Sequence, residues 1–102
     1  MTAILAYNDV VAAGVIAEAD ALGVKVPEDF SVTGLDGIEI SRSVLPVITT
    51  AVQPFEEQGR CAGELLMKIL AGESVNGNIK LMPTLQIGES ASAPRSSGCC
   101  SA

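Results

Sequence analysis

The residues best suited to chemistry are one amide and three carboxylates in the first half of the chain: Asn8, Asp9, Asp36 and Glu39. Asn8 and Asp36 each follow a short apolar, strand-like run. An amide and a carboxylate together supply the donors and acceptors that hydroxyl groups require, which is the chemistry of sugar binding. Sequence spacing alone favours simpler roles, with Asn8 as a helix N-cap and Asp36 as a turn residue before Gly37.

Catalysis is poorly supported by the residue types. The sequence has no histidine and lacks Ser-His-Asp or Cys-His sets and glycine-rich phosphate loops. Asp9, Asp36 and Glu39 could act as paired carboxylates in acid–base chemistry, but Asp9 fits better as a first-turn charge stabilised by the helix dipole. We therefore predict that the chain is not an enzyme.

Composition limits the possible partners. The 102 residues carry 12 acidic and 6 basic side chains, a net charge of −6, and no basic cluster, so this chain should not bind DNA by itself. Charges and glycines interrupt every apolar run before membrane-spanning length, and the N-terminus lacks signal-peptide character, which favours a cytoplasmic location. The cysteines lack zinc spacing, and we predict no metal site and no cofactor. Cys61 is expected to be a core thiol, and Cys99 and Cys100 are expected to be incidental thiols of the tail.

Two strands and a helix are expected to position Asn8 and Asp36. Ala3–Tyr7 reads as a strand, a helix should run from Asp9 to Leu22, and Phe30–Leu35 reads as a second strand. A strand–helix–strand unit implies parallel strands and a right-handed crossover. Both strands then end at the same edge of the sheet, where ligands bind in open α/β folds.

The first helix has two apolar stripes. Val11, Val15 and Leu22 form an expected core-facing stripe, and Asp9 and Asp20 fall on the polar side. The second stripe consists mostly of small residues: Val10, Gly14, Ala17 and Ala21. It favours close packing against another subunit, although an ordinary Ala-rich buried helix is an equally good explanation.

The second half of the chain contains the clearest helix. One or two helical turns should lie within 37–46, followed by a strand over Ile48–Gln53. Pro54–Ala71 should form a surface helix with one buried face, with favourable pairs Glu56–Arg60 and Glu64–Lys68. Short strands are expected over Ile79–Met82 and Thr84–Gly88, and disorder from Glu89 onward, where the residues are small and polar.

Four stretches of the sequence resemble the effector-binding domain of the lactose/galactose repressor (LacI/GalR) family. These stretches follow the family's order and cover residues 3 to about 90: AILAYNDVVAAG (3–14), GVKVPEDFSVTGLDG (23–37), LPVITTAVQP (45–54) and EQGRCAGELLMKILAGE (57–73). In such proteins the Asn of A-x-N-D and the first acidic residue of V-x-G-x-D reach the effector cleft. The resemblance therefore favours ligand binding by Asn8 and Asp36 over the simpler roles of helix N-cap and turn residue. Gly37 replaces a second acidic residue found in many relatives.

The resemblance implies an α/β fold: a parallel sheet with flanking helices, forming part of a periplasmic-binding-protein-like effector domain over residues 1–90. Residues 3–52 would belong to the C-terminal lobe and 54–83 to the N-terminal lobe. Residues 84–90 would return to the C-terminal lobe, and 91–102 would form a disordered tail. The crossings between lobes would be Gln53-Pro54 and Pro83-Thr84. The expected homodimer interface comprises Val10, Ala13, Gly14, Ala17, Ala21, Ile40 and Val44.

Three functional interpretations follow. The first is the ligand-sensing and dimerising part of a regulator that binds a small effector, by resemblance a sugar, and contacts DNA only through a helix-turn-helix absent from this sequence. The second is a fragment of a periplasmic sugar-binding protein of a transporter, which shares the fold. The third is an inactive truncated remnant.

Overall fold

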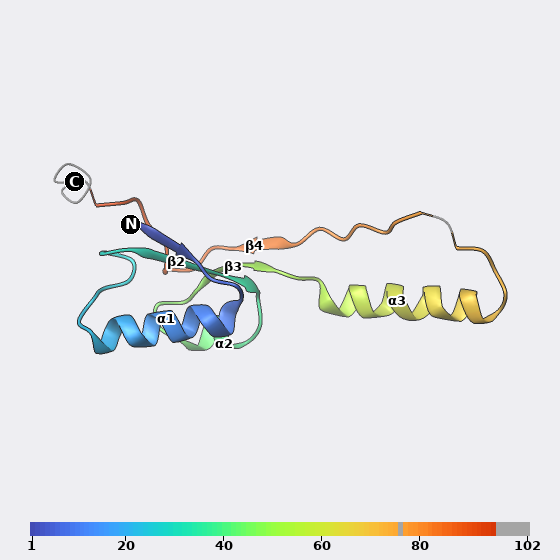
Figure 1. Ribbon diagram of the computed structural model, residues 1–102, viewed down its shortest axis with the longest axis horizontal. Coiled ribbons are helices and arrows are strands. Elements are labelled where there is room, and N and C mark those ends of the chain that lie inside the picture. The colour runs from blue at the N-terminus through green and yellow to red at the C-terminus, as the bar shows by residue number, and fades with distance from the viewer. Residues whose placement is uncertain (76, 96–102) are drawn as a thin grey trace. The chain divides into compact units, whose positions relative to one another are not determined.

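The computed structural model describes residues 1–75 and 77–95 (Figure 1). In chain order the elements are β1 (Ala3–Leu5), α1 (Asp9–Ala21), β2 (Ser31–Asp36), α2 (Ile40–Ser43), β3 (Thr49–Val52), α3 (Phe55–Leu70) and β4 (Thr84–Gln86). The chain divides into two compact units, one containing residues 1–52 and the segment from Leu85 onward, the other containing residues 53–84. No helix among the described residues combines the length and apolar character needed to span a membrane.

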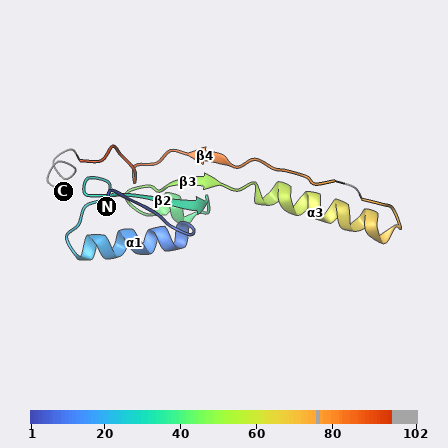
Figure 2. The ribbon, with the colours of Figure 1, turned by 45° about the horizontal axis from the view of Figure 1, so that its top comes forward.

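The first unit is built on a sheet with the strand order β1-β2-β3-β4. β1 and β2 are parallel, with Ala3 opposite Ser31, and β2 and β3 are parallel, with Thr33 opposite Thr49. Figures 1 and 2 show α1 and α2 side by side against one face of this sheet. The predicted α/β class is confirmed, with a sheet of mostly parallel strands and flanking helices.

The core of this unit lies between α1 and the two central strands. Ala12, Ile16, Val32 and Ile48 are buried and contact one another. The predicted core stripe of α1 is therefore wrong, because Val11 and Leu22 are 46% and 70% exposed and Val15 is only partly buried. Apolar residues surround most of α1, so periodicity could not select the buried face, and that face begins with the polar Asp9.

The C-terminal segment binds across the start of β2 and β3. Ser90 is fully buried, and its hydroxyl donates to the Val32 carbonyl and accepts from the Thr49 amide at 2.9 Å. Gly88 passes so close to Val47 that a Cβ would lie 2.8 Å from the Val47 carbonyl carbon. The disordered tail was predicted to start too early, because hydrogen bonds of Glu89, Ser90 and Ser92 fix this segment. Residues from 96 onward, including Cys99 and Cys100, lie outside the described residues.

The second unit contains α3 and the segment that follows it. α3 starts one residue after Pro54, but none of its side chains is buried, so the predicted buried face is wrong for this chain by itself. The face that carries Leu66 and Leu70 is more than half exposed, and Cys61 is partly rather than fully buried. An apolar helix face becomes buried only against another element, and the described residues of 53–84 leave this face exposed.

Two further expectations for this unit are corrected. Arg60 pairs with Glu57 and Glu64 instead of Glu56, and Lys68 forms no ion pair among the described residues. Residues 79–82 are not assigned as a strand, and no other described residue of 54–83 is either. A strand requires a hydrogen-bonding neighbour, so the β-propensity of Ile79–Met82 is not enough by itself.

Candidate functional site

The carboxyl ends of the three parallel strands form the candidate site. Asn8 follows β1 and serves as the N-cap of α1, where its side-chain oxygen accepts from the Val11 amide at 2.9 Å. Asp36 is the last residue of β2, at the level of Val52 at the end of β3. Both side chains are partly exposed at this edge, and no hydrogen bond joins them within the described part of the chain. The Asn8 amide nitrogen remains available to a ligand, so N-capping and ligand binding are compatible.

The backbone at Asp36 is strained. Its φ of 113° lies in a region that residues with a Cβ seldom adopt, and Asp36 is the only described non-glycine residue with a positive φ. Gly37 follows with a φ of 74°, and a Cβ there would lie 2.7 Å from Val52 Cα. A side chain at position 37 would therefore be strained and crowded against Val52, which favours glycine over a second acidic residue at this place.

Asp9 is the functional candidate that sequence reasoning misjudged. It is the first residue of α1 and was expected on the polar side, yet it is fully buried. One carboxylate oxygen accepts from the amides of Gly37 at 2.7 Å and Ile38 at 2.9 Å. The other accepts from the Thr50 hydroxyl at 2.6 Å.

These contacts link all three parallel strands through one side chain. Asp9 follows β1, Gly37 and Ile38 follow β2, and Thr50 lies in β3. Charge-assisted hydrogen bonds offset the cost of burying the carboxylate, and the N-terminal end of α1 adds a favourable dipole. The signal in the sequence was Gly34, because a Cβ at that position would overlap an Asp9 carboxylate oxygen. A glycine inside a strand marks such a close approach.

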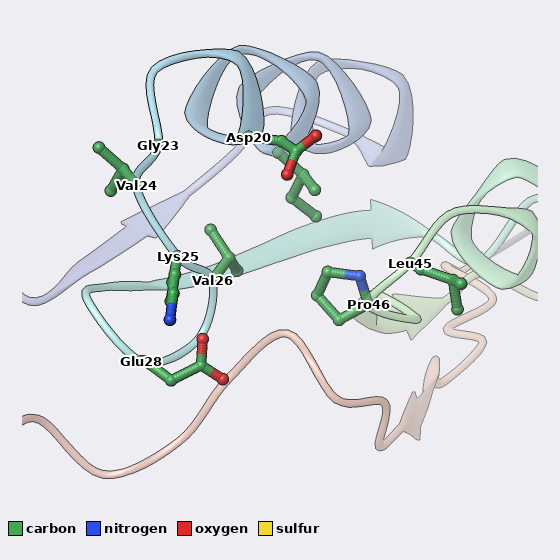
Figure 3. Close-up of a pocket in the computed structure, with 9 residues that line it drawn as sticks. Asp20, Gly23, Val24, Lys25, Val26, Glu28, Leu45 and Pro46 are labelled. Carbon is green, nitrogen blue, oxygen red and sulfur yellow. The ribbon is translucent and has the colours of Figure 1, made fainter.

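A cavity of about 260 Å³ lies at the opposite edge of the sheet (Figure 3). Ile16 and Asp20 contribute from α1, and Leu45 and Pro46 from the connection between α2 and β3. The loop that precedes β2 contributes Gly23–Val26 and Glu28. Neither Asn8 nor Asp36 lines this cavity. No group of acidic, cysteine or histidine side chains suited to a metal ion occurs among residues 1–75 and 77–95.

The predicted dimer residues of α1 are on its surface. Val10 is 55% exposed, and Gly14, Ala17 and Ala21 are also exposed, whereas Ala13 is partly buried. The two remaining members, Ile40 in α2 and Val44 directly after it, are partly buried. The division between the two units falls after Val52 and after Thr84, next to the predicted crossings Gln53-Pro54 and Pro83-Thr84. Their roles in dimerisation and lobe crossing stay predictions.

A family model described as a periplasmic binding protein-like domain matches residues 1–91. Among curated proteins, the HTH-type transcriptional repressor CytR of Escherichia coli strain K12 is 40% identical over 81 residues, which cover 79% of this chain and 24% of the repressor. The chain thus spans about a quarter of the length of that relative.

Solved structures give the same assignment. A LacI family transcriptional regulator from Arthrobacter sp. FB24, in complex with lactose, is 36% identical and superposes with a TM-score of 0.78 over 90% of this chain and 36% of its own. The dimeric Lac repressor is 33% identical, with a TM-score of 0.84 over 92% of this chain and 35% of its own. This chain belongs to the periplasmic binding protein-like domain family and corresponds to part of the effector domain of a LacI-family transcriptional regulator.

Proposed function

We propose that this chain forms one side of a small-molecule site in a sugar-responsive regulator, with Asn8 and Asp36 contacting hydroxyl groups of the effector. The observation that carries this proposal is the strained Asp36 at the carboxyl end of β2, on the same sheet edge as Asn8. Backbone strain concentrates at functional sites, where the surrounding structure maintains it. The lactose complex of the Arthrobacter regulator supports a sugar as the effector class.

A regulator is favoured over a transport protein because the curated relatives are transcriptional repressors. A cytoplasmic location follows from that proposal. The net charge of −6 means that DNA contact would come from a part of the regulator outside these residues. Dimerisation through the exposed stripe of α1, defined by Val10, Gly14, Ala17 and Ala21, completes the proposed function.

Ligand binding is tested by NMR titration of the chain with lactose, and then with cellobiose, pentoses and nucleobases. We expect residue-specific shifts at Asn8 and Asp36. Asn8→Ser retains an N-cap but removes the amide, so it should weaken binding without unfolding α1. Asp36→Gly relieves the backbone strain, and it should raise the free energy of unfolding by about 1 kcal/mol while abolishing the shifts. The absence of specific shifts with every compound would contradict the proposed site.

Dimerisation is tested by light scattering on a matched pair of variants. Val10→Lys places a charge on the stripe, whereas Val11→Lys places the same charge at a neighbouring exposed position outside it. We expect Val10→Lys to give a monomer and Val11→Lys to retain the dimer. Equal behaviour of the two variants would show that the stripe is not the interface.

A further inference from the structure

We infer that Asp9 is the positioning residue for Asp36: its buried carboxylate holds residues 36–38 in the conformation that presents Asp36 at the sheet edge. The ligand-binding part of this inference rests on the proposed function. The hydrogen bonds of Asp9 and the φ of Asp36 do not depend on it.

The hydrogen-bond pattern explains the conformation. A single oxygen of Asp9 accepts from two successive amides, those of Gly37 and Ile38. Successive N–H groups converge on one anion when the backbone forms a concave turn, an arrangement used elsewhere to bind phosphate. Here the anion belongs to the chain itself. The positive φ values of Asp36 and Gly37 are the backbone rotations that this convergence accompanies.

The second oxygen and the surroundings fix the carboxylate. Thr50 donates to it from β3, and Gly34 leaves the space that the carboxylate occupies. On the other side of the turn, Arg42 donates to the Gly37 carbonyl at 3.0 Å. A strained residue persists only where its surroundings determine the conformation, and a charged acceptor forms hydrogen bonds about twice as strong as a neutral one. Asp9 supplies that acceptor for the turn.

A glycine at position 36 would adopt the same backbone without strain, so the Asp36 carboxylate is held there against a conformational cost. Loss of Asp9 should let residue 36 relax to a negative φ and displace its carboxylate. Asp9 would thus act on a ligand through Asp36, without touching the ligand itself.

NMR on the complete chain tests this without any ligand. Asp9→Asn has the same shape but is a neutral acceptor, and Asp9→Ala removes the acceptor. We expect the Gly37 and Ile38 amide protons to shift upfield and exchange faster in the order wild type, Asn, Ala. The three-bond coupling between the amide and Hα protons of Asp36 should change to a value typical of a negative φ. An unchanged Asp36 coupling in a folded Asp9→Asn or Asp9→Ala variant would overturn the inference.

A double-mutant cycle distinguishes positioning from general stabilisation, and it remains informative if Asp9→Ala does not fold. The change in unfolding constant caused by Asp9→Asn is measured with Asp36 present and again combined with Asp36→Gly. If Asp9 maintains the strain of Asp36, its loss also releases that strain when Asp36 is present, so the loss should be roughly fivefold larger when combined with Asp36→Gly, where no strain is left to release. Equal losses in both backgrounds would assign Asp9 a stabilising role only.

Lactose titration of the same variants separates this inference from the proposed function. Weaker lactose binding in Asp9→Asn, together with the changed coupling of Asp36, supports both. If the turn responds as expected but no compound binds wild type, the proposed ligand site fails while the positioning of Asp36 stands. If wild type binds and Asp9→Asn binds equally well with an unmoved turn, the inference fails and the ligand site stands.

Discussion

Replacing Gly37 by alanine should damage the candidate site more than the same change at Gly23. Both residues have a φ of 74°, so alanine costs about 1 kcal/mol of backbone strain at either position. The Gly23 surroundings are open, whereas a Cβ at Gly37 would lie 2.7 Å from Val52 Cα and 2.6 Å from its Cγ2. Overpacking of that kind adds about 1–3 kcal/mol. The expected losses are therefore about 1 kcal/mol for Gly23→Ala and about 2–4 kcal/mol for Gly37→Ala.

Thermal and urea unfolding, followed by circular dichroism, measure this difference. A loss of 1 kcal/mol lowers Tm by about 4–8 °C in a domain of this size, so the two variants should separate clearly. Combining Gly37→Ala with Val52→Ala serves as a control. It removes the Cγ2 overlap but leaves the overlap with the backbone Cα, so stability should recover only in part.

Equal losses at Gly23 and Gly37 would refute the steric part of this reasoning. Full recovery in the Val52→Ala combination would show instead that the side chain, and not the close approach of the backbone, sets the requirement for glycine at position 37. In either case the absence of a second acidic residue at position 37 would need another explanation.

Two further predictions concern other parts of the chain. Ser90→Ala removes the hydroxyl that pairs with the Thr49 amide and the Val32 carbonyl, so the free energy of unfolding should fall by about 1–3 kcal/mol in urea titrations. As a control, Ser43→Ala at an exposed position should change it by less than about 0.5 kcal/mol. Hydrogen bonding to Arg60 holds the pKa of Glu57 below its usual range. A carboxyl group whose pKa is lowered by folding stabilises the folded state at pH values above its unfolded-state pKa. The contribution of this pair to the helicity of α3 should therefore disappear as pH falls through the Glu57 pKa. Arg60→Gln should abolish this part of the pH dependence.

The sequence predicted the elements of the first unit well because local signals agree there. Asn8 is both an N-cap type and the observed N-cap, and Gly23 follows the end of α1 with the positive φ expected after a helix. The parallel arrangement of β1 and β2 followed from the helix between them. Asn8 and Asp36 were therefore predicted to lie at one edge of the sheet, where the structure has them.

The burial of α1 and α3 could not be predicted from the same signals. Residues such as Val11 and Ile16 have similar hydropathy, so only the packing on Val32 and Ile48 determines which one is buried. α3 has a clear apolar face, but no described residue of 53–84 buries it. Local pattern defines a face, and the partner decides whether it is buried.

The role of Asp9 shows why polar residues need tertiary information. An Asp in the first turn of a helix is well explained by the dipole, and nothing within α1 distinguishes a solvated carboxylate from a buried one. The distinction comes from Gly34 and Thr50, which lie on two other strands. A glycine within a strand, read together with an Asp at the end of the neighbouring strand, is the combination that could have indicated it.

The proposed site also sets a limit on the affinity of this chain. Hydrogen bonds from a neutral amide and a carboxylate contribute about 1 and about 2–3 kcal/mol, whereas a Kd of 1 mM already requires about 4 kcal/mol. The loss of translational and rotational freedom makes the net free energy of binding still less favourable. Asn8 and Asp36 alone should therefore bind lactose no tighter than the millimolar range, so NMR shifts at high ligand concentration are the suitable measurement. Micromolar binding by residues 1–102 would mean that contacts beyond Asn8 and Asp36 carry most of the affinity.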